Sequence, residues 1–231
     1  MQFEQVHHTA TDRARWVFAM TKWEATALTV IGKNKKAPLD EQAVRFDVRD
    51  GQVYVWSTDM TQLLVVQPRE RAASDEPSPP DYSFTVTASE LKSVVAKSKA
   101  SEMLYFPTDE PVVLTGPKAE LVPGGKLVAN DTLGELRASP PLDRDANTLR
   151  SVLRESMLTE KATSTTQTII AGRFAATLAA VAKATADAEA WLLCPPADAE
   201  APVVLRVGDD DSGARWTLVL APLAAVADPP L

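Results

Sequence analysis

The sequence predicts an α+β protein made of two similar halves, each a sheet backed by two helices. Two observations predict this fold: an internal repeat, and segments of β period that lie between amphipathic helical segments. The chain has 231 residues, of which 45% are hydrophobic, enough for one large domain or two of modest size.

The repeat joins residues 84–116 to residues 168–208. Each stretch contains, in order, a short β-rich segment, a helix rich in small residues, an apolar strand, an acidic turn marked by proline and another strand. That last strand opens with Pro-Val-Val-Leu both at 111–114 and at 202–205. The shared order favours duplication over chance. We therefore expect two similar domains at 1–117 and 118–231, divided within a turn-rich stretch.

The first half is expected to open with a helix that Asp12 caps and that runs to about Ile31, with Phe18 and Met20 inside it. Alternating apolar residues and an Asp-Gly turn then predict a hairpin. The expected elements are, in order, a strand at 43–48, a turn at Asp50-Gly51, strands at 53–56 and 63–66, and an exposed proline-rich loop at 68–81.

Each repeat should contain a helix with one buried stripe. Thr87-Ala88-Ser89-Glu90 is a capping box, which predicts a helix over 88–99. The expected buried residues are Leu91, Val94 and Val95 in the first repeat, and Phe174, Thr177, Leu178 and Val181 in the second. Another helix is expected from the cap Asp145 to about Leu158.

Catalytic signatures are missing from the sequence. The two histidines are adjacent, His7 and His8, so they cannot build a histidine zinc cage, and a catalytic triad would need its base from the chain start. Asp209-Asp210-Asp211 is better explained as a solvated turn than as a cation site, and Cys194 as a small hydrophobic residue than as a nucleophile. We expect no enzyme, no cofactor and no metal.

The chain start shows no targeting segment, and no apolar run approaches the length that spans a bilayer. These features predict a soluble, cytoplasmic protein without a membrane partner.

Charge gives the remaining functional signal. The formal net charge is −7, yet the expected helices carry Lys and Arg on their polar faces. If these faces share one surface, the basic stripe would attract nucleic-acid phosphate without reading sequence. The alternative, which composition alone favours, is that they are ordinary solvated helix faces.

Two stretches resemble the DNA sliding clamps. Residues 43–59, AVRFDVRDGQVYVWSTD, are similar to the bacterial clamp hairpin that ends in Ala-Thr-Asp. The family's leucine follows at Leu63, whereas Gln62 stands where an arginine is usual. Residues 216–223, WTLVLAPL, resemble the last strand of the family, which closes with a hydrophobic-Pro-hydrophobic sequence.

The resemblance implies a processivity factor for DNA replication, a ring that encircles duplex DNA and tethers a replicative polymerase. It also implies a hydrophobic pocket where these two stretches meet, which receives short peptides from the polymerase and the clamp loader. The implied pocket residues are Thr58, Met60 and Leu63 on one wall, and Val219, Ala221, Pro222 and Leu223 on the other. The implied DNA-facing residues are Arg13, Lys22, Lys92, Lys99, Arg150, Arg154, Arg173 and Lys183.

The sequence also departs from the family. The usual bacterial clamp has three domains, so a ring of six domains built from this chain would be a homotrimer. The stretch between about 158 and 172 is too short for the usual strands, so either the second domain is reduced or its first helix is misassigned. Modest size and divergence suggest a phage clamp. The alternative function is a non-ring, clamp-related adaptor that binds a replication partner.

Overall fold

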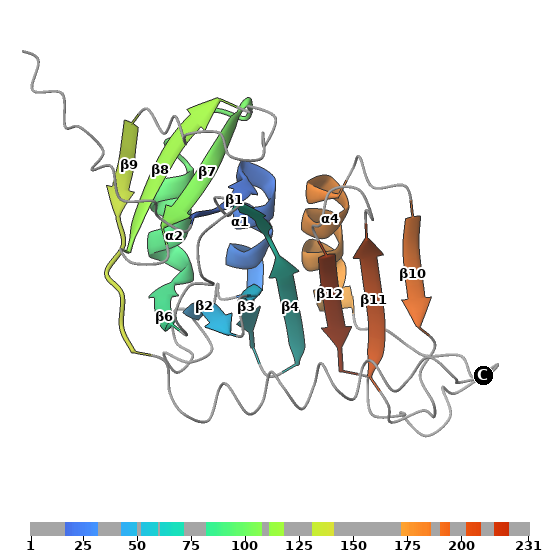
Figure 1. Ribbon diagram of the computed structural model, residues 1–231. Helices are drawn as coiled ribbons and strands as arrows, with labels where there is room; N and C mark the ends of the chain where they lie inside the picture. The colour runs from blue at the N-terminus through green and yellow to red at the C-terminus, as the bar shows by residue number, and fades with distance from the viewer. Residues whose placement is uncertain are drawn as a thin grey trace, which may run out of the picture.

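The computed structural model has an α+β fold of two antiparallel sheets that share one layer of helices (Figure 1). The fold class predicted from the sequence is confirmed. The residues that the structure describes are 17–31, 43–49, 52–59, 61–71, 82–107, 111–117, 131–140, 172–185, 190–194, 202–208 and 215–221.

The smaller sheet has five strands in the order β5-β1-β7-β8-β9. Its central strands alternate between two faces, so that Phe18, Leu104 and Phe106 enter the main core. Phe18 and Phe106 stack there with ring centroids 5.2 Å apart. The strands are β1 (Val17–Thr21), β5 (Arg69–Arg71), β7 (Glu102–Pro107), β8 (Val112–Pro117) and β9 (Asp131–Glu135).

The larger sheet has seven strands in the order β10-β11-β12-β4-β3-β2-β6. The predicted hairpin is present, because the strands at 43–49 and 52–58 pair in an antiparallel register that places Arg49 opposite Gln52. The strands are β2 (Ala43–Arg49), β3 (Gln52–Thr58), β4 (Gln62–Gln67), β6 (Tyr82–Thr87), β10 (Ala190–Cys194), β11 (Val203–Gly208) and β12 (Arg215–Leu220).

The described helices form one layer in which α1 packs against α2 on one side and α4 on the other. In Figure 1, α4 lies behind β11 and β12. The predicted buried stripes are confirmed: Leu91, Val94 and Val95 are buried on α2, and Phe174, Thr177 and Val181 are buried at α4, with Leu178 partly buried. The helices are α1 (Lys22–Ile31), α2 (Ala88–Val95) and α4 (Ala175–Ala184), the last preceded by a 3₁₀ turn at Gly172–Phe174.

Successive strand-helix-strand units exchange their first strands. β1 precedes α1 but pairs with β7 of the following unit, and β6 precedes α2 but pairs with β2 of the preceding unit. The two parts of the sequence repeat share a helix followed by an antiparallel strand pair, β7–β8 after α2 and β10–β11 after α4. The third unit, α4–β10–β11–β12, joins the larger sheet through β12 and β4. Because β9 pairs with β8, the sheet of the first repeat continues to residue 135. The domain boundary expected near residue 118 stays a prediction.

The first predicted helix is wrong at its start. Residues 17–21 form β1, and α1 begins only at Lys22. A capping box explains the boundary, because the Thr21 N–H donates to Glu24 Oε2 at 2.5 Å and the Glu24 N–H donates to Thr21 Oγ1 at 3.2 Å. Phe18 and Met20 join the main core, whereas Ala19 between them joins a cluster on the other face, which is the two-residue alternation of a strand.

Three smaller corrections concern element limits. α2 ends at Val95 rather than Lys99, and Arg69–Arg71 inside the expected loop is an edge strand. A strand also occupies Asp131–Glu135, in a stretch that carries no β pattern of its own. The helix expected at 145–158 and the Asp209-Asp210-Asp211 turn lie outside the described residues.

Candidate functional site

The two stretches that were expected to wall a pocket meet at the seam, the antiparallel pairing of β4 with β12. Leu63 lies directly opposite Val219 in this pairing. The seam continues past the end of β12, since the Ala221 N–H donates to the Thr61 carbonyl oxygen at 2.8 Å. Because paired residues on neighbouring strands share a face, Leu63 and Val219 point to the same side of the sheet.

That side is the face turned away from the main helix-covered core, and it carries an apolar cluster of its own. The cluster consists of Trp56, Leu63, Val65, Val204 and Val219, with Tyr54 packed against it. Leu63 is only 6% exposed and Val219 only 8%, whereas Thr58 and Ala221 are half-buried at the end of the row. The expected pocket residues Met60, Pro222 and Leu223 lie outside the described residues.

The carboxylate of Asp59 holds the turn between β3 and β4. Its Oδ1 atom accepts hydrogen bonds from the Thr61 N–H at 3.0 Å, the Thr61 hydroxyl at 2.8 Å and the Gln62 N–H at 2.9 Å. Thr58 Oγ1 closes the turn by donating to the Gln62 carbonyl oxygen at 2.9 Å. This turn therefore has a defined shape on the wall of the candidate pocket.

Four of the expected DNA-facing residues have exposed side chains: Lys92 on α2, Lys99 beyond its end, Arg173 before α4 and Lys183 on α4. The side-chain ammonium group of Lys92 on α2 has no hydrogen-bond or ion-pair partner within the described part of the chain. Arg173 is exposed just before α4, with its guanidinium carbon 5.1 Å from the centroid of the Phe174 ring. The exposed positions of α2 and α4 hold Ser, Lys and Ala residues, whereas the acidic residue of α2, Glu90, is half-buried in the first turn and accepts from the Arg137 N–H.

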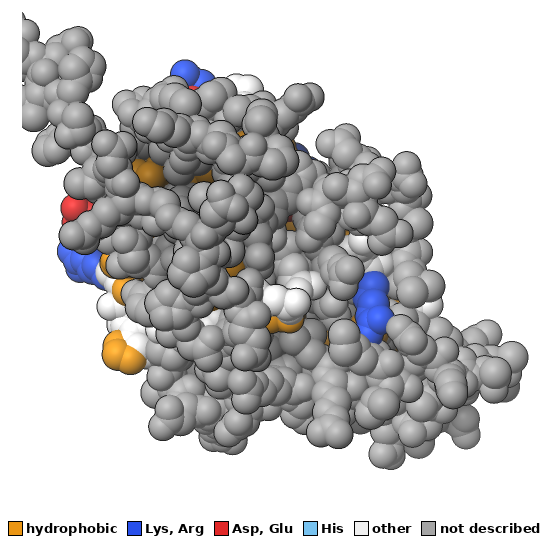
Figure 2. Space-filling model, in the orientation of Figure 1, with side chains coloured by type: hydrophobic (Ala, Val, Ile, Leu, Met, Phe, Trp, Pro, Cys, Tyr) orange, Lys and Arg blue, Asp and Glu red, His pale blue; other side chains and the backbone are white. Residues whose placement is uncertain are grey.

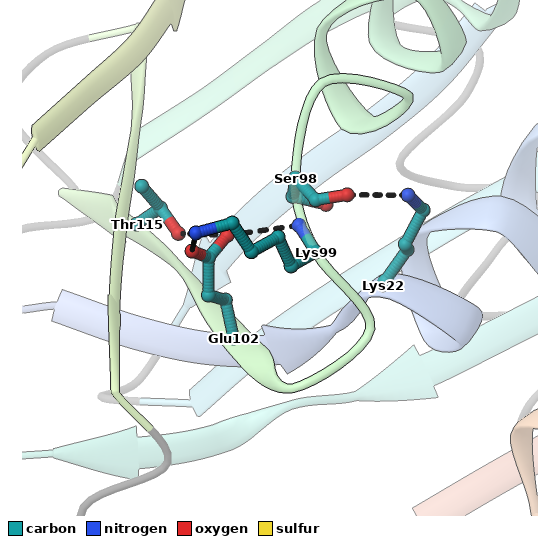
Figure 3. A network of polar contacts seen from close by, with 5 residues as sticks. All are labelled: Lys22, Ser98, Lys99, Glu102 and Thr115. Carbon is teal, nitrogen blue, oxygen red and sulfur yellow. Dashed lines mark hydrogen bonds and ion pairs between the residues drawn. The ribbon is translucent and has the colours of Figure 1, made fainter.

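Lys22 and Lys99 have partners inside the chain (Figure 3). Lys22 Nζ donates to the Ser98 carbonyl oxygen at 2.5 Å, just beyond the C-terminal end of α2, where the helix dipole favours a cation. Lys99 Nζ lies 3.6 Å from Glu102 Oε1. The Lys99 backbone N–H, which donates to Glu102 Oε2 at 2.8 Å, is the main reason that the pKa of Glu102 is lowered; the Thr115 hydroxyl and the Lys99 charge act in the same direction.

Lys183 is also engaged, at the contact between two helices. Its Nζ atom lies 3.6 Å from the centroid of the Trp23 ring, which ties α4 to α1 through a cation–π contact. Arg13, Arg150 and Arg154 lie outside the described residues. Within the described ranges, the least engaged cations of the expected set are therefore Lys92 and Arg173.

On the face seen in Figure 2, the visible described Lys and Arg side chains lie apart from one another. No group of His, Cys, Asp and Glu residues in the described ranges could hold a metal ion. None of the helices formed by those residues is long and apolar enough to cross a membrane.

Two contacts of the site were not expected from the sequence: the Trp23–Lys183 pair and the bridge that Gln62 makes to Thr177 of α4. Thr177 Oγ1 donates to Gln62 Oε1 at 2.7 Å, and Gln62 Nε2 donates to Asp59 Oδ2 at 2.8 Å. One signal in the sequence marked this position, namely that Gln62 stands where the clamps usually have an arginine. Thr177 was expected only as part of a buried stripe.

The sequence matches no protein-family model and no curated protein. Among solved structures, the DNA polymerase III beta subunit of Thermotoga maritima superposes with a TM-score of 0.51 at 8% identity, over 93% of this chain and 66% of that one. The beta subunit of Caulobacter crescentus gives 0.47 at 11%, over 92% of this chain and 66% of that one. Proliferating cell nuclear antigen of Entamoeba histolytica gives 0.48 at 12%, over 91% of this chain and all of that one.

The Thermotoga likeness shows the fold. DNA polymerase III beta subunits are sliding clamps, so the fold expected from the two resembling stretches is confirmed. The chain spans just under two-thirds of the length of the bacterial beta subunits that it matches.

Proposed function

We propose that this protein is a DNA sliding clamp, which encircles duplex DNA and tethers a replicative polymerase. The observation that carries the proposal is the continuous helix layer, α2–α1–α4, which spans the seam and carries exposed Lys92 and Arg173. A layer of this kind could line a channel while the sheets form the outside of a ring. Contacts to phosphate from such side chains are independent of base sequence.

The proposed mechanism is topological. A closed ring cannot leave DNA sideways, so retention requires no tight binding, and weak phosphate contacts permit sliding. The net charge of −7 discourages adhesion of the outer surface to DNA. No bond is made or broken by the protein in this role, and it needs no cofactor.

The ring is proposed to be a homotrimer of head-to-tail subunits. Heterologous contacts that close generate a ring, and exposed sheet edges such as that of β9 are suited to pairing with another chain. Three subunits of two domains each would supply six domains to such a ring, and we propose a phage origin for the protein. We place the protein in the cytoplasm with the replication machinery.

Partner peptides are proposed to bind at the seam, beside Leu63 and Val219. Clamp loader and polymerase would each present a short apolar segment there, with Thr58 and Ala221 at the accessible rim. Recognition by a few apolar anchors allows several partners to use one pocket. The expected residues Met60, Pro222 and Leu223 would complete its walls.

The pocket is tested with Ala221→Asp, which places a charge at the half-buried rim and keeps the backbone N–H that bonds Thr61. We expect binding of a fluorescent peptide with a Leu-Phe pair to weaken at least tenfold, measured by anisotropy. Ala100→Asp, at an exposed turn position between α2 and β7, is the matched control and should bind as wild type. Equal peptide binding by the wild type and both variants would show that the seam is not the peptide site.

The ring is tested by its topology. The protein is assembled with nicked circular DNA, filtered through a sizing column and then treated with a restriction enzyme. We expect protein to elute with the circle and to dissociate once the DNA is linear, because only a ring slides off an end. Lys92→Glu should shorten retention on the circle. Equal release of the protein from circular and from linear DNA would favour the non-ring adaptor.

A further inference from the structure

β4 presents two consecutive residues to opposite sides of the seam. Leu63 faces the candidate pocket, whereas Gln62 pairs with Leu220 and faces helix α4. A displacement of β4 relative to α4 must therefore also displace the pocket wall. The strand itself links the two surfaces.

Both the oxygen and the nitrogen of the Gln62 side-chain amide form hydrogen bonds. Its Oε1 accepts from the Thr177 hydroxyl at 2.7 Å, and its Nε2 donates to Asp59 Oδ2 at 2.8 Å. Thr177 is 1% exposed, so its hydroxyl cannot exchange this partner for water without cost. An arginine carries donors but no acceptor, so it could not accept a hydrogen bond from the Thr177 hydroxyl as Gln62 does.

The chain of contacts continues to the far side of the seam. Asp59 Oδ1 holds the N–H groups of Thr61 and Gln62, and the Thr61 carbonyl oxygen accepts from the Ala221 N–H at 2.8 Å. Hydrogen bonds therefore run from α4, through Gln62 and the Asp59 turn, to the residue at the rim of the candidate pocket. They join segments that are 115 residues apart in the sequence.

We propose that Gln62 is a positioning residue of the partner pocket, which fixes the wall of the pocket against helix α4. The assignment rests on the peptide-binding role proposed above. Gln62 touches no peptide in this account; it acts by holding the Asp59 turn and, through Thr61, the end of β12. The position at which this chain departs from the clamp pattern is thus used to lock the seam from the helix side.

A matched pair of variants tests the assignment. Thr177→Val keeps the shape of the side chain and removes the hydroxyl, whereas Thr177→Ser keeps the hydroxyl and removes a methyl group. We expect Thr177→Val to weaken binding of the Leu-Phe peptide about fivefold, in line with the loss of one hydrogen bond, and Thr177→Ser to bind nearly as wild type. Gln62→Glu, which places a carboxylate against Asp59, should weaken binding further.

Amide hydrogen exchange, followed by NMR, separates this assignment from the peptide-binding proposal. The Gln62 and Ala221 N–H groups should exchange faster in Thr177→Val but not in Thr177→Ser. This result supports the role of Gln62 in holding the Asp59 turn and the end of β12, even if the wild-type protein binds no peptide. In that case only the peptide-binding proposal fails. Unchanged exchange in Thr177→Val, or equal effects of Val and Ser, would overturn the assignment. If Thr177→Val does not fold, Gln62→Glu decides by the same measurement.

Discussion

The two regions that carry the sequence repeat are stabilised in different ways. In β6–α2–β7–β8–β9, the helix has a side-chain cap, since the Glu90 N–H donates to Thr87 Oγ1. In α4–β10–β11–β12, the helix follows a 3₁₀ turn, and Phe174 at its N-cap makes no side-chain cap hydrogen bond. The same order of elements therefore does not imply the same local signals.

Their attachment to the rest of the fold differs as well. The first region is interwoven with its neighbour, because β6 lies in the larger sheet and β1 lies beside β7. The described contacts of the second region with the rest are mainly β12 on β4 and α4 on α1. We conclude that strand exchange stabilises the first region against unfolding. The second region depends on the seam, where partner binding is proposed.

The largest expected effect comes from a cavity at the seam. Leu218 is buried opposite Leu64, and Leu218→Ala should lower the unfolding free energy by about 2–5 kcal/mol. Hydrogen exchange should show α4–β10–β11–β12 opening while β6–α2–β7 stays protected. Leu104→Ala, at an equally buried site of β7, should instead lower protection across the interwoven region. The same exchange pattern in both variants would contradict the comparison.

A smaller effect is expected at the helix cap. Thr87→Ala removes the acceptor for the Glu90 N–H and should cost about 1 kcal/mol, measured by urea unfolding. Exchange should rise in the first turn of α2 and stay constant in α4. Loss of protection in α4 of similar size would show that the two helices do not differ as described.

The tie between helices should contribute less. Lys183→Met removes the cation above Trp23 and should cost about 0.5–1 kcal/mol of stability. The control is Lys92→Met, a change at an exposed lysine for which the described residues provide no ion-pair partner, and it should leave stability unchanged. Duplex DNA binding at low salt should respond in the opposite order, with Lys92→Met the weaker binder. A larger loss of stability in Lys92→Met would refute this division of roles.

The smallest effect concerns pH. The pKa of Glu102 is lowered in the folded protein, chiefly by the hydrogen bond from the Lys99 N–H, so its ionised form stabilises the fold above its unfolded pKa. That contribution is lost as the pH falls through the lowered folded value. In Glu102→Gln, the difference in Tm from wild type should be small at neutral pH and should vanish in acid. A difference that grows with acidity would contradict the assignment.

Much of the fold could be predicted because its signals are local. The capping box at Thr87, the Asp50-Gly51 turn and the alternation in β2 each lie within a few residues. β1 was missed because its partners, β5 and β7, are distant in sequence, although Thr21 and Glu24 formed a second capping box that marked the true helix start. β9 has no pattern of its own and is a strand because β8 pairs with it.

The candidate site also has a part that short stretches of sequence could predict and a part that depends on contacts between distant residues. The meeting of Leu63 with Val219 was expected from two short stretches that resemble clamp sequences, and the structure pairs them. The partners of Lys22 and Lys183 could not be expected, since Ser98 and Trp23 reach them only in the folded chain. Helix periodicity places a lysine on a face, but it does not show whether another element occupies the charge.

The central claim, that three copies of this chain close a ring, is tested most directly by its mass in solution. Sedimentation equilibrium at micromolar concentration should give three times the mass of the chain, unchanged in Ala221→Asp because the candidate pocket lies apart from the β9 edge in the fold. A mass equal to one chain at that concentration would contradict the ring.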